Sequence, residues 1–290
     1  METTRITELL PAFRAWLAEG EKSPATIEKY LRDVRRFARF AGDAPLTRQL
    51  VLDYKAALAG EYAVASANSM LASLGAFFRF MGRPELCVRQ FKVQRQPYLP
   101  EDKLLTRQEY QRLVRAAEHQ PRLQLMLQTI CATGIRVSEL CHITVEAARQ
   151  GEAVVRCKGK VRTILLIREL RTLLLRYAEG EGITAGPVFI TRGGQPVSRI
   201  AVWRGMKALC ERAHVAPAKV FPHNLRHLFA RTFYAAGKDI VQLADVLGHA
   251  SINTTRIYTA TTFAAHRRRM EGMHLLISGT KKAPAAPQAE

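Results

Sequence analysis

Near its C-terminal end the chain contains the stretch LGHASINTTRIYTA, in which His249 follows a glycine and Tyr258 comes nine positions later. Two other stretches add further polar side chains. HNLRHLFARTF carries His223 and Arg226 three positions apart, the spacing of neighbours on one helical face. CATGIRVSELCHI carries Arg136 shortly after a glycine. A phenol, two guanidinium groups and two imidazoles are thus present, with no carboxylate cluster beside them in the sequence that could bind magnesium.

This combination suits the cleavage of a phosphodiester by a side-chain hydroxyl group. Such an attack passes through a five-coordinate phosphorus that carries extra negative charge on its non-bridging oxygens. Two arginines can bind those oxygens bidentately, in place of the metal ions that other phosphoryl-transfer enzymes use. A phenol has an unperturbed pKa of about 10, so it needs that positive field or a nearby base to act as a nucleophile. The leaving sugar oxygen needs a proton, and the turn CKGKVR offers Lys158 and Lys160, although lysines in turns are ordinarily only solvated.

Each stretch also has an ordinary structural interpretation. Arg136 is expected in the first turn of a helix that begins after Gly134, where free backbone N–H groups favour an anion. Glu139 could hold its guanidinium group, although an isolated Arg–Glu pair is usually only a surface feature. His227 adjoins Arg226, so it is expected to face away from it and to be structural.

The elements that must position these side chains are predicted to be mainly helical. Residues 1–82 are typical of several short helices, the clearest of which begins at SPATIEKYLRDVRRFARFAG. Ser23 can cap this helix, its apolar residues recur at spacings of three and four, and Gly42 ends it. Its opposite face is basic, and the overall charge modestly favours phosphate contact over simple solvation. The basic residues of this face are Lys29, Arg32, Arg35, Arg36 and Arg39.

A change of pattern separates this region from a second domain. Residues 83–101 lose helical periodicity, contain three prolines and are typical of an extended linker. The second domain is predicted over residues 102–278 and opens with a helix whose Thr106 and Glu109 have the spacing of a capping box. Residues 279–290 are rich in Pro and Ala and are predicted to form a disordered tail.

Two β-rich stretches interrupt the helical pattern of the second domain. EAVVRCKGKVRTILLI is predicted to form a hairpin, and GPVFITRGGQPVS a short strand and turn before Ser198 caps another helix. KDIVQLADVL is predicted to form an amphipathic helix that ends at Gly248. Ser251 can then cap a short helix that carries Tyr258 near its end.

The composition favours a polyanionic partner. The 290 residues are 48% hydrophobic, enough for more than one core, and 44 Lys and Arg against 25 Asp and Glu leave a net charge of +19. Nucleic acid is the first candidate, ahead of a solvated basic surface or a ribosome-associated protein. The five cysteines are scattered without a C-x-x-C pair, which indicates reduced thiols in a cytoplasmic protein. The sequence shows neither a secretory signal nor a stretch typical of a membrane span, so no membrane partner is expected.

The motifs ATGIRVSEL, HNLRH, LGH and TTRIYT occur in the order and at the approximate spacings of the tyrosine recombinase, or phage integrase, family. The chain resembles most closely the small Xer-like members, from about residue 5 to 278. The resemblance implies a mainly α fold with a small β-sheet or hairpin in the catalytic domain. It also implies a helical, SAM-like core-binding domain over residues 1–82 and a catalytic domain over 102–278, which together form a C-shaped clamp on DNA.

The resemblance further implies roles for the polar residues. Arg136 and Arg226 match the two arginines that bind the scissile phosphate. His223 matches a proton acceptor and His249 a hydrogen-bond donor to the phosphate. Tyr258 matches the nucleophile that forms a 3′-phosphotyrosyl bond.

The same resemblance covers the general acid and the cofactors. Lys158 matches the family's hairpin lysine, which is the expected general acid. Because this hairpin is one residue shorter than the usual Xer-like turn, Lys160 is an alternative. The implied reaction exchanges DNA strands through a Holliday junction and uses no metal, ATP or other cofactor.

The resemblance also implies partners. Four protomers would bring together two double-stranded recombination sites, as a homotetramer or, with a second recombinase, as a heterotetramer. The segment FAAHRRRMEGMHLLIS would dock on a neighbouring protomer, or else form a helix on its own domain. Its apolar residues are Met270, Met273, Leu275, Leu276 and Ile277.

Two alternative functions share much of this pattern. A type IB topoisomerase uses similar chemistry but does not explain the Xer-like N-terminal half. A DNA-binding accessory protein that has lost cleavage would not need to keep all six expected side chains. Integration or excision of a mobile element and resolution of DNA multimers use the same reaction, so the motifs are compatible with either role.

Overall fold

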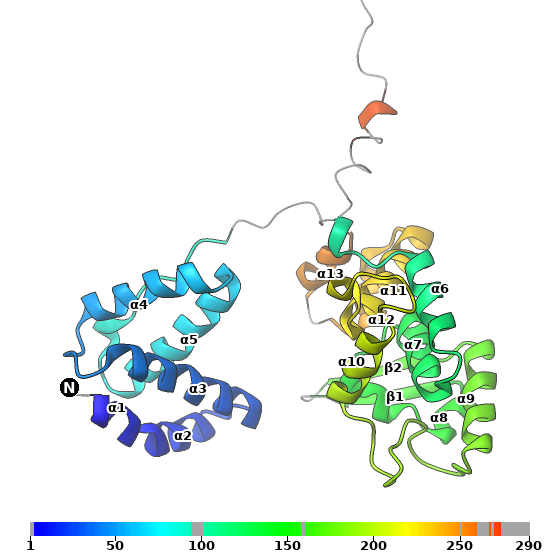
Figure 1. Cartoon of the computed structure of the whole chain (residues 1–290), viewed down its shortest axis with the longest axis horizontal. Helices are drawn as coiled ribbons and strands as arrows, with labels where there is room; N and C mark the ends of the chain where they lie inside the picture. The colour runs from blue at the N-terminus through cyan, green and yellow to red at the C-terminus, as the bar shows by residue number, and fades with distance from the viewer. Residues whose placement is uncertain are drawn as a thin grey trace, which may run out of the picture. The chain divides into compact units, whose positions relative to one another are not determined.

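The computed structural model contains two compact units, Met1–Arg95 and Gln96–Glu290 (Figure 1). It describes residues 3–93, 101–157, 160–249, 251–259, 267 and 270–273. Both units are mainly helical, and the described strands form one two-stranded antiparallel sheet, which confirms the predicted fold class. None of the described helices combines the length and apolarity needed to cross a membrane.

The first unit packs its helices around a core rich in phenylalanine. Its elements are α1 (Thr3–Glu8), α2 (Leu10–Glu19), α3 (Pro24–Ala41), α4 (Arg48–Glu61), α5 (Val64–Phe80) and the 3₁₀ helix η1 (Pro84–Leu86). The Ser23 hydroxyl accepts a hydrogen bond from the Thr26 backbone N–H, and Gly42 follows the last residue of α3, so both predicted ends of this helix are confirmed. Phe13, Phe37 and Phe77 are fully buried where α2, α3 and α5 meet.

The first part of the expected linker packs on this unit. Leu86 is buried, and Phe91 lies against the same core. The Asn68 side-chain amide donates to the Phe91 carbonyl (2.9 Å) and accepts from its N–H (2.8 Å). The prolines and basic residues of this stretch suggested an extended connection. Its apolar residues and an amide that satisfies the backbone hold it against the unit.

The second unit places the hairpin among helices. Its elements are η2 (Glu101–Lys103), α6 (Arg107–Ala116), α7 (Pro121–Thr133), η3 (Val137–His142), α8 (Val145–Gln150), β1 (Glu152–Cys157), β2 (Lys160–Leu165), α9 (Arg168–Gly180), α10 (Arg199–Ala208), η4 (Pro217–Lys219), α11 (Pro222–Gly237), α12 (Ile240–Leu247) and α13 (Ile252–Thr259). α7 packs against α9 and α11 in the core, and α11, α12 and α13 lie together (Figure 1).

Local signals in the second unit are mostly confirmed. Thr106 and Glu109 form the capping box of α6, and Ser198 caps α10. The strand predicted in GPVFITRGGQPVS is wrong, because that stretch forms only isolated bridges at Pro187 and Pro196. Proline has no N–H to donate to a ladder, so the pairing does not extend.

Gly134 connects α7 to η3 at a point of very close packing. Its φ of +65° lies in the left-handed region. A Cβ at this position would lie 2.7 Å from Phe229 Cε1 and 3.1 Å from Leu247 Cδ2. Both the backbone angle and the space therefore require glycine at the junction of α7, α11 and α12.

We expect Gly134→Ala to lower the free energy of unfolding of the second unit by about 3 kcal/mol, because backbone strain adds to overpacking. Gly182→Ala is the matched control, since Gly182 has a φ of +69° but nothing within 4 Å of an added Cβ. The control should lose only about 1 kcal/mol. Urea unfolding of both variants measures the difference, and equal losses would contradict the steric argument.

Candidate active site

Arg226 lies at the centre of the polar cluster in the second unit. It extends from α11, is 1% exposed and donates from Nη1 to the Gly134 carbonyl (2.5 Å) and from Nη2 to the Leu247 carbonyl (2.8 Å). These carbonyls stand at the C-terminal ends of α7 and α12, where the helix dipole favours a cation. The Arg226 Nε atom is buried without a partner. The guanidinium group is thus fixed in place with one donor left unused.

The charge of Arg226 is maintained against opposing influences. Burial, reinforced by the charge of Arg136, lowers its pKa to about 10, although the nearby Tyr258 hydroxyl acts in the opposite direction. A pKa of about 10 leaves the group protonated at neutral pH. The cluster therefore presents a fixed positive field.

Arg136 stands at the entrance of η3 and is more open to solvent. The helix expected after Gly134 is a 3₁₀ helix, and Arg136 is its N-cap residue with extended backbone angles. The predicted partner is confirmed, because Arg136 Nη1 donates to Glu139 Oε1 (3.0 Å) and its backbone N–H donates to Oε2 (3.0 Å). Its side chain is 40% exposed, so the guanidinium group is held from one side and open on the other.

Arg162 is a third arginine of the cluster that was missed in the sequence. It extends from β2, forms an ion pair with Glu139 and donates from Nη1 to the Val246 carbonyl (3.1 Å). The signal that could have found it is strand alternation. Val161 and Leu165 are exposed and Ile164 is buried, so an arginine at position 162 falls on the inward face.

Tyr258 lies among three imidazoles. It is 2% exposed on α13, with ring centroids at 4.5 Å from His227, 5.7 Å from His249 and 6.4 Å from His223. The hydroxyl of Ser251 accepts from the Asn253 backbone N–H at the predicted start of α13. The phenol is thus positioned next to both histidines expected at the site.

His249 ties α12 to α13 and to Arg226. It directly follows Gly248, which has a φ of +63° and ends α12 as expected. Its Nε2 lies 3.0 Å from Arg226 Nη2, and its Nδ1 lies 2.9 Å from the hydroxyl of the fully buried Thr255. Arg226 can only donate, so Nε2 accepts and the proton is assigned to Nδ1. Burial, reinforced by the charge of Arg226, lowers the pKa of His249 to about 4.

His223 and His227 share one face of α11, four residues apart. His227 was expected to face away from Arg226 and to be structural, but spacing four places it on the side of His223, and its ring lies against Tyr258. Burial lowers the pKa of both imidazoles, that of His227 to about 4. Each is therefore neutral at pH 7 and can accept a proton.

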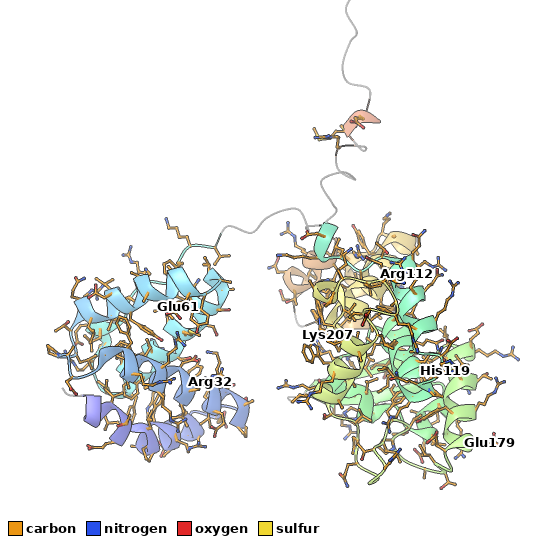
Figure 2. The ribbon with its side chains drawn as sticks, in the orientation of Figure 1. Arg32, Glu61, Arg112, His119, Glu179 and Lys207 are labelled. Atoms are coloured by element: carbon orange, nitrogen blue, oxygen red, sulfur yellow. The ribbon has the colours of Figure 1, made fainter. Side chains whose placement is uncertain are left out.

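We expect the second unit to lose stability as the pH falls from about 6.5 to about 4. The pKa values of His227 and His249 lie near 4, below the ordinary 6.5, so the unfolded chain takes up protons first and acid favours unfolding. His227→Gln should flatten this dependence in urea unfolding between pH 7 and 4. His119→Gln, at an exposed position on the same unit (Figure 2), is the control. Parallel curves for wild type and His227→Gln would contradict this explanation.

Several expected site residues are not placed by the structure. Lys158 lies outside the described residues, and only the backbone of Lys160 is described, in β2. Met270 and Met273 are exposed, and the other apolar residues of the expected docking segment lie outside the described part of the chain. Within the described residues, no three His, Cys, Asp or Glu side chains gather as metal ligands would.

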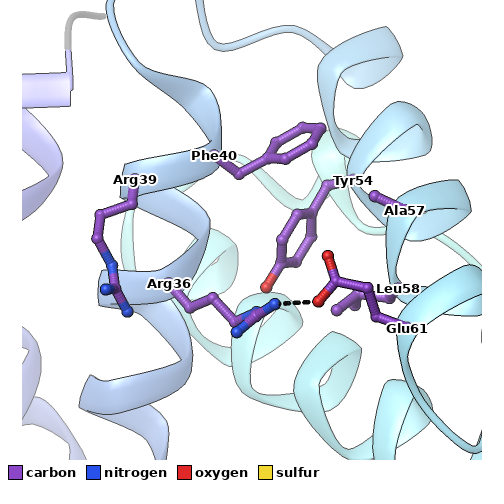
Figure 3. A pocket seen from close by; sticks show the side chains of 7 residues that line it. All are labelled: Arg36, Arg39, Phe40, Tyr54, Ala57, Leu58 and Glu61. Carbon is purple, nitrogen blue, oxygen red and sulfur yellow. Dashed lines mark hydrogen bonds and ion pairs between the residues drawn. The ribbon is translucent and has the colours of Figure 1, made fainter.

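The basic face of α3 divides into engaged and open side chains. Lys29 donates to Asp33 Oδ2 (2.5 Å) and to the Ser73 hydroxyl (3.0 Å). Arg36 pairs with Glu61 near the Tyr54 hydroxyl, and Arg39 lies apart from that pair (Figure 3). The arginines of this face that are exposed are Arg32, Arg35 and Arg39. These three are the ones available to an anionic partner.

Comparison with known proteins agrees with this geometry. Residues 103–265 match the phage integrase family, and residues 11–84 match the phage integrase N-terminal SAM-like domain. The chain is 30% identical to tyrosine recombinase XerA of Pyrococcus furiosus over 285 residues, which cover 95% of this chain and 97% of the relative.

Solved structures show the same fold. The crystal structure of XerA recombinase is 25% identical, with a TM-score of 0.52 over 93% of this chain and 99% of that one. A lambda integrase tetramer bound to a Holliday junction is 21% identical, with a TM-score of 0.71 over 87% of this chain and 76% of that one.

Proposed function

The chain belongs to the phage integrase family, and from this premise we propose that it is a site-specific tyrosine recombinase that cuts and rejoins double-stranded DNA. The observation that carries the proposal is the placement of Tyr258 against His249 and Arg226, at the junction of three helices. A phenol in a field of fixed cations is the arrangement that nucleophilic attack on a phosphate requires.

We assign phosphate binding to Arg136 and Arg226. Arg226 has a buried Nε donor without a partner, and such a donor costs free energy unless a ligand satisfies it. Arg136 has an exposed guanidinium group that Glu139 holds from behind. Together they can donate to both non-bridging oxygens of one phosphate, where negative charge grows in the transition state.

We assign the covalent step to Tyr258. Its Oη would form a bond to phosphorus while the bond from phosphorus to the 5′ oxygen breaks, which leaves a 3′-phosphotyrosyl linkage and a 5′ hydroxyl. The phenolic proton would pass to His223, a neutral imidazole beside the ring. The 5′ oxygen would take a proton from Lys158 or Lys160 of the hairpin. Religation reverses these transfers with the 5′ hydroxyl of another strand.

Tyr258 and Arg226 are inaccessible to a DNA phosphate in the described arrangement, so DNA binding must expose them. Tyr258 and Arg226 are almost fully buried, and the Thr255 hydroxyl ties α13 to His249. A phosphate that reaches Arg226 would displace the phenol from its present place and take over contacts to Arg226. His249 would then turn from acceptor to donor at Nε2, because a phosphate oxygen offers only lone pairs.

We infer double-stranded recombination sites and other protomers as the partners. The lambda integrase of similar fold forms a tetramer on a Holliday junction. Strand exchange between two duplexes needs four cleavages, hence four copies of a site that contains one tyrosine. Two copies would act on each duplex.

We expect the exposed arginines of α3 to contact DNA phosphates. Substituting Arg32, Arg35 and Arg39 together by Gln should weaken duplex binding and reduce the slope of log affinity against log salt by about 0.9 per lost contact. Lys29→Gln is the control, since Lys29 is engaged with Asp33. Filter binding from 50 to 200 mM salt measures the slope. An unchanged slope in the triple variant would assign the phosphate contacts elsewhere.

The test of the proposed function is covalent capture. The duplex carries the recombination site and has a nick next to the scissile phosphate. Cleavage then releases the short fragment that carries the 5′ hydroxyl, so the covalent adduct cannot religate. Incubation without added metal should give a protein–DNA band that survives denaturant and disappears after protease treatment. Absence of the band on the site that the protein binds would refute the proposal.

A further inference from the structure

Arg162 joins three segments that carry the proposed chemistry. It extends from β2, contacts Glu139 of η3 and donates to the Val246 carbonyl at the end of α12. Glu139 in turn holds Arg136. The next carbonyl of α12, that of Leu247, holds Arg226. One side chain therefore connects the lysine-bearing hairpin to both proposed phosphate-binding arginines.

The backbone at Gly248 packs directly against the Arg162 side chain. A Cβ at Gly248 would come within 3.2 Å of Arg162 Nε and closer still to its Cδ. Gly248 also has a φ of +63°, so two independent reasons require glycine there. The motif LGH thus brings the α12 backbone directly onto the Arg162 side chain.

An arginine at position 162 costs more free energy than a purely structural role would require. Its side chain is 11% exposed, and its Nε is buried without a partner. It shares the single carboxylate of Glu139 with Arg136, close to a third cation, Arg226. An apolar residue on this inward strand face, like the neighbouring Ile164, would pack at lower cost. The planar guanidinium group of Arg162 uses separate nitrogens for the Glu139 carboxylate and the Val246 carbonyl, a fixed fork that an ammonium group does not offer.

We propose that Arg162 is a positioning residue that holds the hairpin in the place where its lysine can protonate the leaving 5′ oxygen. The inference rests on the proposed function, because it takes the hairpin lysine as the general acid. Arg162 follows Lys160 by two residues in β2, so a contact that fixes Arg162 fixes the start of that strand. Without the contact, the phosphate would still be bound but the proton donor would be displaced.

The experiment compares two leaving groups in single-turnover cleavage. One duplex has the natural bridging 5′ oxygen at the scissile phosphate, and the other has sulfur there. A thiolate leaves without a proton, because thiols are far more acidic than alcohols. We expect Arg162→Met to cleave the oxygen substrate about 100-fold more slowly than wild type, the size of a lost general acid. The sulfur substrate should be cleaved within a few-fold of the wild-type rate.

Each outcome separates this inference from the proposed function. If wild type forms no covalent adduct on either duplex, the proposed function fails. If wild type cleaves both duplexes, two results overturn the positioning role. In one, Arg162→Met slows cleavage of the oxygen and sulfur substrates equally; in the other, it slows cleavage of neither. Arg156→Met is the matched control on the exposed face of the same hairpin and should keep the wild-type ratio of the two rates.

A conservative variant keeps the test decisive if Arg162→Met does not fold. Arg162→Lys retains the charge and can reach Glu139 or the Val246 carbonyl, but not both with fork geometry. Its oxygen-to-sulfur rate ratio should lie between those of wild type and the Met variant. A ratio equal to that of wild type would show that charge alone suffices and would contradict the bridging argument.

Discussion

Tyr258→Phe is expected to abolish the covalent protein–DNA adduct and recombination, with a loss of roughly 10⁴-fold or more in cleavage rate. The substitution removes the only atom that would attack phosphorus and leaves the ring in place. That ring packs on His227 and His249, so the fold should be retained. Loss of one hydroxyl contact should cost about 1 kcal/mol of stability.

The measurement is adduct formation on the nicked duplex, together with a gel shift at the same DNA concentration. DNA binding should remain within a few-fold of wild type. Tyr234→Phe is the matched control, because Tyr234 lies on α11 and packs against the same small cluster. An adduct of normal yield with Tyr258→Phe would show that another group is the nucleophile.

Arg226→Lys is expected to slow cleavage by about 10³-fold, the effect of losing preorganised donors to the transition-state charge. Lysine keeps the positive charge, but a single ammonium group cannot hold the Gly134 and Leu247 carbonyls, contact His249 and bind a phosphate oxygen together. Carbonyls left unsatisfied in the core should also lower stability by about 1 to 3 kcal/mol. Cleavage rates are therefore compared at saturating DNA and at a temperature where both proteins are folded.

Arg231→Lys serves as the control for Arg226→Lys. Arg231 lies on the same helix and donates to the Leu105 carbonyl (2.6 Å). It also has a buried Nε without a partner, so it shares the structural cost of Arg226. Its Lys variant should lose stability but keep most of the cleavage rate. If both variants lose cleavage equally, Arg226 has only a structural role.

A large part of the fold follows from local sequence signals. Ser23, Thr106 and Ser198 cap the helices that were predicted from them, and Gly248 ends α12. These signals act within about four residues, where a side chain meets backbone groups of its own turn. The strand predicted near Pro187 did not form, because its β propensity could not replace the N–H donors that Pro187 and Pro196 lack.

The sequence alone determined which side chains are available for the reaction, in which order they occur, and that the protein is basic and mainly helical. Only the tertiary structure decided how they combine. Arg226 is held by a carbonyl 92 positions away, and Arg162 by one 84 positions away. The tertiary structure also decided that His227 packs on Tyr258 and that the phenol is buried. The physical reason is that a periodic pattern reports which side of an element is apolar. It does not report which remote backbone groups that side will meet, and those groups position the charges at this site.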